Sequence, residues 1–577
     1  MSSQPPSHDD PETAQHWRFI SNIDNSDDTN SNARCEEIKT TPLFSSSVRL
    51  AAKEGRLGFE REGNVPIHPQ YGLLGARVET YGRNDDDIAD EEVMERSTER
   101  DLIYSNTTAP HSTFICGSQG VGKSHTLSCI LENSLLSPCR TGALKNPLSA
   151  IMFHYDQFTS SSTTQVCESA YLCSSGIPVR VLVSPSNYDV MEKLYTNLPG
   201  LPADAPKPEV HKLYFSEKQL NITMMKTLMA VGGGEGPVPL YLEVVSKILR
   251  DMARESQGAP GINYALFKRR LQEQPFTGAQ NGPLNMRLAL LESFLDQTVS
   301  GMHTASDTDI WSFKKGSLTI VDLSCTFVQE NDACALFNLC LSLFLENRSS
   351  GGRLVALDEA HKFLTTNSRE AISFTEGILS LIRQQRHLAT RVVIATQEPT
   401  LSPSILDLCN VSIVHRFTSP AWFKALEGHL AGACLGVADG EGGSDEMFRK
   451  IVKLRTGEAF VFCPSAILDL LTIKSRAERS RSSADRSSSE GSGEVVDEED
   501  EGNESDGIDE GATLEGPAVE SDSHSEEEGS EGTESTNADG EEEHARKVRV
   551  QELGARYIRL KVRNRVTADG GRSILAV

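Results

Sequence analysis

One segment constrains the fold more than any other: GSQGVGKS at residues 117–124, which lies between an apolar run and a stretch with helical periodicity. The run STFIC at 112–116 is typical of a buried strand. In a strand–loop–helix unit, glycines let backbone N–H groups surround phosphate oxygens beside the positive end of the helix dipole. The segment therefore predicts a phosphate-binding loop (P-loop); the alternative is a glycine turn followed by a surface lysine. We expect a bound nucleotide to contact Gly117, Ser118, Gln119, Gly120, Val121, Gly122, Lys123, Ser124 and His125.

Two side chains of this loop and two later carboxylates predict the chemistry. Lys123 is placed to reach the β and γ phosphates, and Ser124 is placed to ligate Mg²⁺. RLVALDEAH at 353–361 is an apolar strand that ends in Asp358 and Glu359. We expect Asp358 to hold the metal through water and Glu359 to polarise the attacking water. Taken alone, the two carboxylates could instead begin a helix as an N-cap.

The segment after the two carboxylates supplies further candidates. RVVIATQEP at 391–399 puts Gln397 at the end of the next strand, where it could sense the γ-phosphate or position water; the alternative is a simple strand-end turn. Between these strands lies a helix whose basic face carries Arg383, Arg386 and His387. We expect Arg386 to reach a neighbouring subunit's nucleotide or a DNA phosphate, although such a face is usually only solvated.

Short apolar runs alternate with helix-like stretches from residue 112 to 463, a pattern that predicts an α/β fold with a largely parallel sheet. Between residues 206 and 305 the pattern becomes helical. We therefore expect a helical insertion between a P-loop half of the core at 66–205 and a Walker B half at 306–475. The expected strands are 112–116, 149–155, 179–184, 317–324, 353–358, 391–396, 411–417 and 457–463.

The net charge of -26 comes from one stretch, since residues 490–544 hold 23 Asp and Glu and no Lys or Arg. The rest of the chain is nearly neutral, so an anionic ligand is not excluded. We expect disorder for residues 1–65 and for a Ser-rich and acidic linker at 476–545. Residues 546–577 should form a strand segment in which apolar and basic side chains alternate. The acidic stretch could compete with a polyanion for basic surfaces, or serve only as a solubilising linker.

Cysteine usage and hydropathy bear on the compartment. The 12 cysteines form no CxxC pair and no cluster with zinc spacing. No stretch reaches the ~18 apolar residues of a membrane helix. We expect a cytoplasmic or nuclear protein with reduced, buried cysteines and no membrane segment.

The order of motifs resembles that of the HerA/FtsK branch of P-loop ATPases. The resemblance rests on ICGSQGVGKS, TIVDLS, LVALDEAHKFL, RQQRHLATRVVIATQEPTLS, VSIVHRF and LRTGEAFVF, and it covers about residues 110–200 and 310–465. In layout the chain looks closest to a group of fungal P-loop containing nucleoside triphosphate hydrolases. The resemblance implies a RecA-like core that binds ATP and Mg²⁺ between subunits, in a homo-hexameric ring acting on DNA. A full N-terminal β-barrel like that of HerA is not evident, and the acidic insert departs from the family pattern.

Three hypotheses follow from the sequence. The first is an ATP-hydrolysing oligomeric motor or remodeller that acts on nucleic acid. The second is an ATP-dependent switch or signalling NTPase that acts on a protein partner, and the third is an interaction protein whose acidic tail is the functional element. The LDEAH string does not indicate a DEAH-box helicase, because no second helicase domain with an arginine-bearing motif is present.

Overall fold

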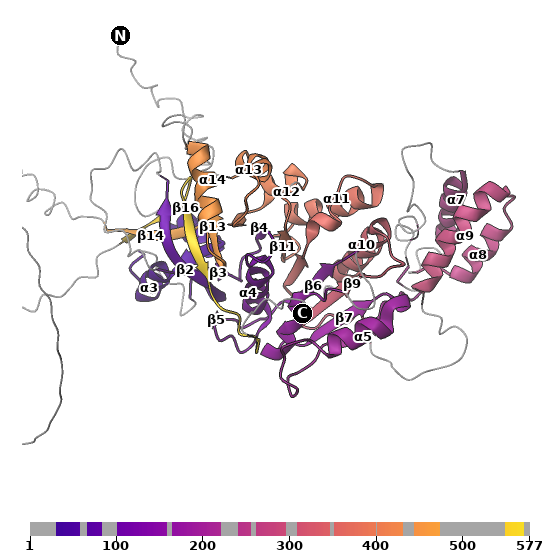
Figure 1. Cartoon of the computed structure of the whole chain (residues 1–577), viewed down its shortest axis with the longest axis horizontal. Coiled ribbons are helices and arrows are strands. Elements are labelled where there is room, and N and C mark those ends of the chain that lie inside the picture. The colour runs from indigo at the N-terminus through magenta and orange to yellow at the C-terminus, as the bar shows by residue number, and fades with distance from the viewer. Residues whose placement is uncertain are drawn as a thin grey trace, which may run out of the picture. The chain divides into compact units, whose positions relative to one another are not determined.

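In a computed structural model, the chain forms a large mixed sheet with helices on both faces (Figure 1). The structure describes residues 31–57, 66–82, 101–157, 164–217, 219–220, 225, 240–255, 261–295, 309–346, 351–399, 401–430, 443–472 and 548–569. The strands are β1 (Leu43–Ser45), β2 (Tyr71–Tyr81), β3 (Leu102–Asn106), β4 (Ser112–Cys116), β5 (Gly142–Ala143), β6 (Ser149–His154), β7 (Val179–Val183), β8 (Glu209–Lys212), β9 (Leu318–Asp322), β10 (Arg353–Leu357), β11 (Thr390–Thr396), β12 (Val411–His415), β13 (Glu458–Phe462), β14 (Ile467–Thr472), β15 (Val548–Glu552) and β16 (Tyr557–Val562). The α-helices are α2 (Ser31–Thr40), α3 (Ser46–Glu54), α4 (Lys123–Leu135), α5 (Tyr188–Thr196), α7 (Leu240–Glu255), α8 (Tyr264–Gln272), α9 (Gly278–Ser293), α10 (Glu330–Glu346), α11 (Arg369–Arg383), α12 (Pro403–Leu408), α13 (Pro420–Glu427) and α14 (Gly443–Lys453). Short 3-10 helices are η2 (Glu168–Ser175), η3 (Pro185–Asn187) and η6 (Ala360–Lys362).

Parallel strands form the part of the sheet that carries the P-loop, in the order β12, β4, β11, β10, β6, β9, β7 and β8. Every residue of β4, β6, β9, β10, β11 and β12 is buried. Strands that are covered on both faces are apolar throughout, as these sequences are. The expected α/β fold with a parallel-rich sheet is confirmed, and each of the eight expected strands is present.

The sheet has an apolar layer on each face, and each layer is covered by its own set of helices. On one face, α4, η2 and α5 pack on strand residues such as Ile115 and Met152. On the other face, α10, α11 and α12 pack on alternating strand neighbours such as Phe114 and Phe153. Successive strand residues point to opposite faces, so each buried strand contributes to both layers.

Beyond β12 the sheet continues antiparallel through β13, β16, β2, β3 and β1. β14 then pairs parallel with β1, and β15 lies beside β14. β16 follows all other strands in the sequence but lies between β2 and β13, with Leu560 opposite Arg77 on one side and Ala459 on the other. Ile558, Leu560 and Val562 of β16 are buried. The tail strand expected from the alternation therefore returns to the interior of the sheet.

Part of the N-terminal segment differs from expectation. Residues 31–57 form α2, β1 and α3, where the sequence analysis expected disorder over residues 1–65. Phe44 and Val48 are fully buried, and Ser45 accepts the Val48 N–H as the N-cap of α3. The expectation is wrong for these residues because their apolar side chains are covered by β3 and β14, which lie far away in the sequence. The rest of the expected segment, residues 1–30 and 58–65, lies outside the described residues.

The helical insertion is formed by α7, α8 and α9. The apolar face of α7 carries Val245, Ile248, Leu249 and Met252, which are all buried. It starts later than expected, because β8 still belongs to the parallel sheet. Within the described residues, no helix is both long and apolar enough to cross a membrane.

The acidic stretch lies between two neighbouring strands. Residues 473–547 fall outside the described part of the chain, and they include the acidic stretch at 490–544 and the expected linker at 476–545. The strands that flank it, β14 and β15, are adjacent in the sheet. Leu553 and Gly554 donate backbone hydrogen bonds to Ala466 and Pro464, so the chain runs back beside the strand that it left.

Candidate nucleotide-binding site

The loop between β4 and α4 has the glycine-dependent shape of a phosphate cradle. Gly117, Gly120 and Gly122 all have positive φ values, of 149°, 74° and 115°. A Cβ atom on Gly117 would lie 2.7 Å from Cβ of His415, so a larger residue cannot occupy this position without displacing the next strand. Helix α4 begins directly at Lys123, so its N-terminal N–H groups face the space inside the loop.

Residues after β12 and before β13 hold this loop in place. Ser118 N–H donates to the Arg416 carbonyl at 2.9 Å, and Gly457 N–H donates to the Val121 carbonyl at 3.1 Å. His415, fully buried, donates from Nδ1 to the Glu458 carbonyl at 2.9 Å, and its Nε2 lies 3.0 Å from Thr126 Oγ1.

Sequence reasoning missed the role of His415, although VSIVHRF is one of the motifs that carried the family resemblance. Burial lowers the pKa of this imidazole to about 4, so it is neutral at pH 7. A neutral histidine has one ring N–H and one acceptor nitrogen. It can therefore bridge two elements beneath the loop without placing another positive charge beside Lys123.

The lysine of the loop is folded back over its own backbone. Lys123 is 5% exposed, and its ammonium group donates to the Ser118 carbonyl at 2.9 Å. Burial lowers the pKa of Lys123, while the charges of Glu359 and Asp358 act in the opposite direction. The ammonium group is thus desolvated and placed where a phosphate oxygen could replace the carbonyl.

Ser124 and Asp358 come together at the carboxyl end of the parallel strands. The Ser124 hydroxyl donates to Asp358 Oδ1 at 3.5 Å, although 233 residues separate them in sequence. Burial raises the pKa of Asp358 to about 7, and the neighbouring Glu359 charge adds to the increase. A hydroxyl beside a buried carboxylate is a donor set that fits Mg²⁺, which takes few protein ligands and completes its shell with water and substrate phosphates. The described residues contain no group of three or more His, Cys, Asp and Glu side chains that could hold a metal ion.

Glu359 is held in an unusual backbone conformation. Its φ of 52° is in the left-handed region, which a non-glycine residue rarely adopts. Gln397, which follows β11, donates from Nε2 to Glu359 Oε1 at 2.9 Å. The other carboxylate oxygen lies 3.4 Å from His361 Nδ1 and has no hydrogen-bond partner among the described residues. The arrangement leaves one buried carboxylate oxygen available to accept a hydrogen bond from water.

Neighbouring strand ends carry further buried polar groups that sequence reasoning did not select. His154 ends β6 and Asp322 ends β9, with His154 Nδ1 3.3 Å from Asp322 Oδ1, while Tyr195 donates to the other oxygen of Asp322 at 2.5 Å. Burial acts to lower the pKa of His154, but the Asp322 carboxylate outweighs it and the pKa is raised. Glu168, the first residue of η2, adds a negative charge that acts on both Lys123 and Asp358.

Two further expected site residues, Arg386 and His125, have defined positions, and their expected contacts with a nucleotide or a DNA phosphate stay predictions. Arg386 is exposed and follows α11, only a few residues before β11 begins, at the amino end of the parallel strands. The P-loop leaves the carboxyl end of β4, so the structure does not bring Arg386 to the P-loop of its own chain. His125 is half-buried, and its Nε2 donates to the Arg563 carbonyl at 2.8 Å rather than facing open solvent.

No protein-family model matches the sequence, and a comparison with curated proteins finds no match. Solved structures do show similarity. VirB4 of Thermoanaerobacter pseudethanolicus is 11% identical, with coverage of 69% of this chain and 100% of that chain and a TM-score of 0.42. The bacterial conjugative coupling protein TrwBdeltaN70 is 13% identical, with coverage of 73% and 96% and a TM-score of 0.35. B204, the DNA-packaging ATPase of Sulfolobus turreted icosahedral virus, is 12% identical, with coverage of 61% and 92% and a TM-score of 0.26.

Proposed function

We propose that this chain binds ATP with Mg²⁺ and hydrolyses it. The observation that carries the proposal is the convergence of Ser124 and Asp358, 3.5 Å apart, beside the buried ammonium group of Lys123. A hydroxyl, a carboxylate and a lysine around a glycine loop at a helix N-terminus match the needs of a magnesium triphosphate.

Each residue has a separate task in this proposal. Lys123 exchanges the Ser118 carbonyl for β and γ phosphate oxygens, and Ser124 with Asp358 holds the metal. When bound, Mg²⁺ neutralises charge on the phosphates. Glu359 accepts a hydrogen bond from the attacking water through its unpartnered oxygen, and Gln397 fixes the orientation of that carboxylate.

Two variants test these assignments against matched controls. Lys123→Ala should lose ATP binding, whereas Glu359→Gln should bind ATP but turn it over at least about a hundredfold more slowly. Lys193→Ala and Glu376→Gln change exposed residues of the same kinds and should behave as the parent protein. Phosphate release and binding of a fluorescent ATP analogue, each with Mg²⁺ and with EDTA, give the readouts. Turnover by Glu359→Gln at the parent rate would remove Glu359 from the mechanism.

We further propose that the ATPase works as an oligomeric motor or remodeller on nucleic acid, with a homo-hexamer as the expected assembly. The support is the motif order, since the described surface adds little. Four arginines of the C-terminal segment are paired within the chain: Arg556 with Asp469, Arg559 with Glu79, Arg563 with Glu132 and Arg565 with Asp569.

This internal pairing favours keeping the second candidate, an ATP-dependent switch that acts on a protein partner. Turnover with and without double-stranded and single-stranded DNA, and particle mass with a non-hydrolysable ATP analogue, distinguish the two. A DNA-stimulated ring supports the motor, and unchanged turnover of a monomer or dimer supports the switch. Arg386→Ala mixed with Lys123→Ala tests the role of Arg386 across subunits: recovery of turnover in mixed assemblies supports it, and no recovery at any ratio contradicts it.

A further inference from the structure

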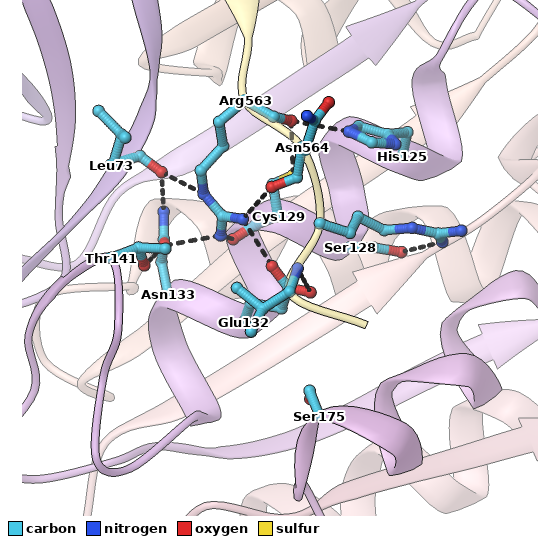
Figure 2. Close-up of polar contacts among 12 residues, drawn as sticks. Leu73, His125, Ser128, Cys129, Glu132, Asn133, Thr141, Ser175, Arg563 and Asn564 are labelled. Carbon is cyan, nitrogen blue, oxygen red and sulfur yellow. Dashed lines mark hydrogen bonds and ion pairs between the residues drawn. The ribbon is translucent and has the colours of Figure 1, made fainter. Parts of the chain in front are cut away.

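The C-terminal segment lies along the P-loop helix after leaving β16. We call residues Arg563–Asp569 the C-terminal strap. Figure 2 shows the strap beside α4, with Arg563 among polar groups of that helix. The strap contacts α4 through His125, Ser128, Cys129, Glu132 and Asn133, which span more than two turns of the helix.

Arg563 is the central contact of the strap. Its guanidinium group has five N–H donors, and each has an acceptor within 3.1 Å (Figure 2). The acceptors on α4 are the Glu132 carboxylate at 2.7 Å, the Asn133 side chain at 3.0 Å and the Cys129 carbonyl at 3.1 Å. The two others are the carbonyls of Leu73 on β2 and Asn564 of the strap. A lysine has three donors on a single nitrogen and cannot reproduce this set.

Glu132 depends on the strap for both of its oxygens. It is fully buried, and its carboxylate accepts from Arg563 through Oε2 at 2.7 Å and from the Val566 N–H through Oε1 at 2.8 Å. A buried carboxylate in the middle of α4 is tolerated only while these partners remain. The position of α4 is therefore tied to that of the strap.

The strap also reaches the second element that faces the nucleotide site. Ala568 N–H donates to Ser174 Oγ of η2 at 3.0 Å, and η2 begins at Glu168. At the other end of the strap, the Arg563 carbonyl accepts from His125, the residue directly after the magnesium-binding Ser124. The strap thus connects the first turn of α4 with η2, on the face of the sheet that α4 covers.

We propose that the C-terminal strap is a clamp on the P-loop helix that sets nucleotide affinity, with Arg563 as its positioning residue. The inference rests on the proposed ATP site. Phosphate binding by backbone N–H groups at a helix start depends on the position of that start, and small displacements of positioned groups weaken the interaction strongly. Because coupling is reciprocal, a nucleotide that needs the clamped position of α4 must in turn stabilise the strap.

A pair of arginine variants separates positioning from general stability. Arg563→Met removes the clamp. Arg556→Met removes another buried arginine of the same C-terminal segment, one that pairs with Asp469 on β14 and donates to the carbonyls of Glu552 and Leu553. At a temperature where circular dichroism shows both proteins folded, Arg563→Met should raise the Kd for ATP at least about tenfold, and Arg556→Met should change it less than about twofold. Arg563→Lys should give only partial recovery.

The unsubstituted protein supplies a second test that does not depend on folding of a variant. Hydrogen exchange of peptides covering residues 557–569 should slow when ATP analogue and Mg²⁺ are added, while peptides of β14 should not change. Two results would overturn the clamp. One is an equal change in Kd in the two methionine variants, and the other is an unchanged hydrogen-exchange rate of the strap when a nucleotide is shown to bind. A parent protein that binds no nucleotide would instead overturn the proposed function, and the two failures are distinguishable.

Discussion

At the scale of single residues, the site combines strain with tight polar restraint. Glu359 has a left-handed backbone, with φ of 52°, and its side chain is held by one hydrogen bond from Gln397. Such a conformation costs on the order of 1–3 kcal/mol, and it persists where the surroundings impose it. The strain aims the carboxylate toward the P-loop side of the strand ends, where a water-polarising group is useful.

Gln397 should therefore act through Glu359. We expect Gln397→Ala to lower kcat about tenfold to a hundredfold and to leave KM nearly unchanged, because it frees the carboxylate without removing a phosphate contact. Steady-state phosphate release measures both constants. Gln384→Ala, a change at an exposed glutamine after α11, is the matched control. A change in KM alone would show that Gln397 binds substrate directly.

His415 makes the site sensitive to acid. Its pKa is lowered by burial to about 4, below the ~6.5 of an unfolded histidine, so the unfolded chain binds a proton more readily. The stability from the neutral ring is complete above pH ~6.5 and is lost as pH falls toward 4, a loss on the order of 3 kcal/mol. His415→Asn keeps a donor for the Glu458 carbonyl and does not titrate. The free energy of unfolding should thus fall less for this variant than for the parent between pH 7 and 4.5. Parallel pH profiles would contradict the assignment.

At the scale of elements, the buried parallel strands were predictable, and the elements that complete the site were not. Runs such as RLVALD and RVVIAT are apolar throughout, and that alone indicates strands covered on both faces. The pairing of Ser124 with Asp358 was likewise expected, because a P-loop and an acidic strand end have few other arrangements.

Other elements depend on partners too distant in sequence to be read from local pattern. β1 is only three residues long, and its position is set by pairing with β3 and β14. The contact of Arg563 with Glu132 joins residues 431 positions apart, and nothing in either local sequence marks the pair. The alternation in β16 predicted a strand but could not predict insertion between β2 and β13.

The packing of β2 on the P-loop helix gives a test at this scale. A Cβ atom on Gly72 would lie 2.2 Å from Asn133 Cγ, so Gly72→Ala must displace the asparagine that bonds Arg563 and the Leu73 carbonyl. We expect a loss of about 1–3 kcal/mol in the free energy of unfolding. Gly278→Ala, in the first turn of α9 with nothing near its Cβ, should be neutral or slightly stabilising. Denaturant titration measures both, and equal midpoints would contradict the predicted clash.

At the scale of the whole molecule, the acidic stretch connects two neighbouring strands of one sheet and does not join separate domains. β14 and β15 are adjacent, and residues up to Leu471 and from Val548 belong to the same compact unit. Arg556, Arg563 and Arg565 of the tail already have carboxylate partners, whereas Arg549 and Lys561 are exposed. The solubilising linker and competition with a polyanion therefore both stay as predictions.

Replacement of residues 476–545 by a short Gly/Ser turn should therefore leave the fold intact. We expect Tm to change by less than about 3 °C and ATP turnover to stay within about twofold, since a shorter loop between adjacent strands lowers the entropic cost of closure. Calorimetry and phosphate release provide the measurements, and DNA affinity across a salt titration tests competition directly. Tighter DNA binding by the shortened protein at low salt would support the competitive role.

The position of β16 also bears on how the protein is made. A ribosome releases β2 and β13 long before β16, so the nascent chain carries two unpaired strand edges where the sheet will later close. Exposed edges of this kind pair readily with other chains. Until residue 563 has emerged, Glu132 of the P-loop helix also lacks its arginine partner. We therefore expect the proposed ATP site to be completed only after the strap has emerged, and a chain that stops within the acidic stretch to lack both β16 and the contacts that the strap makes with α4.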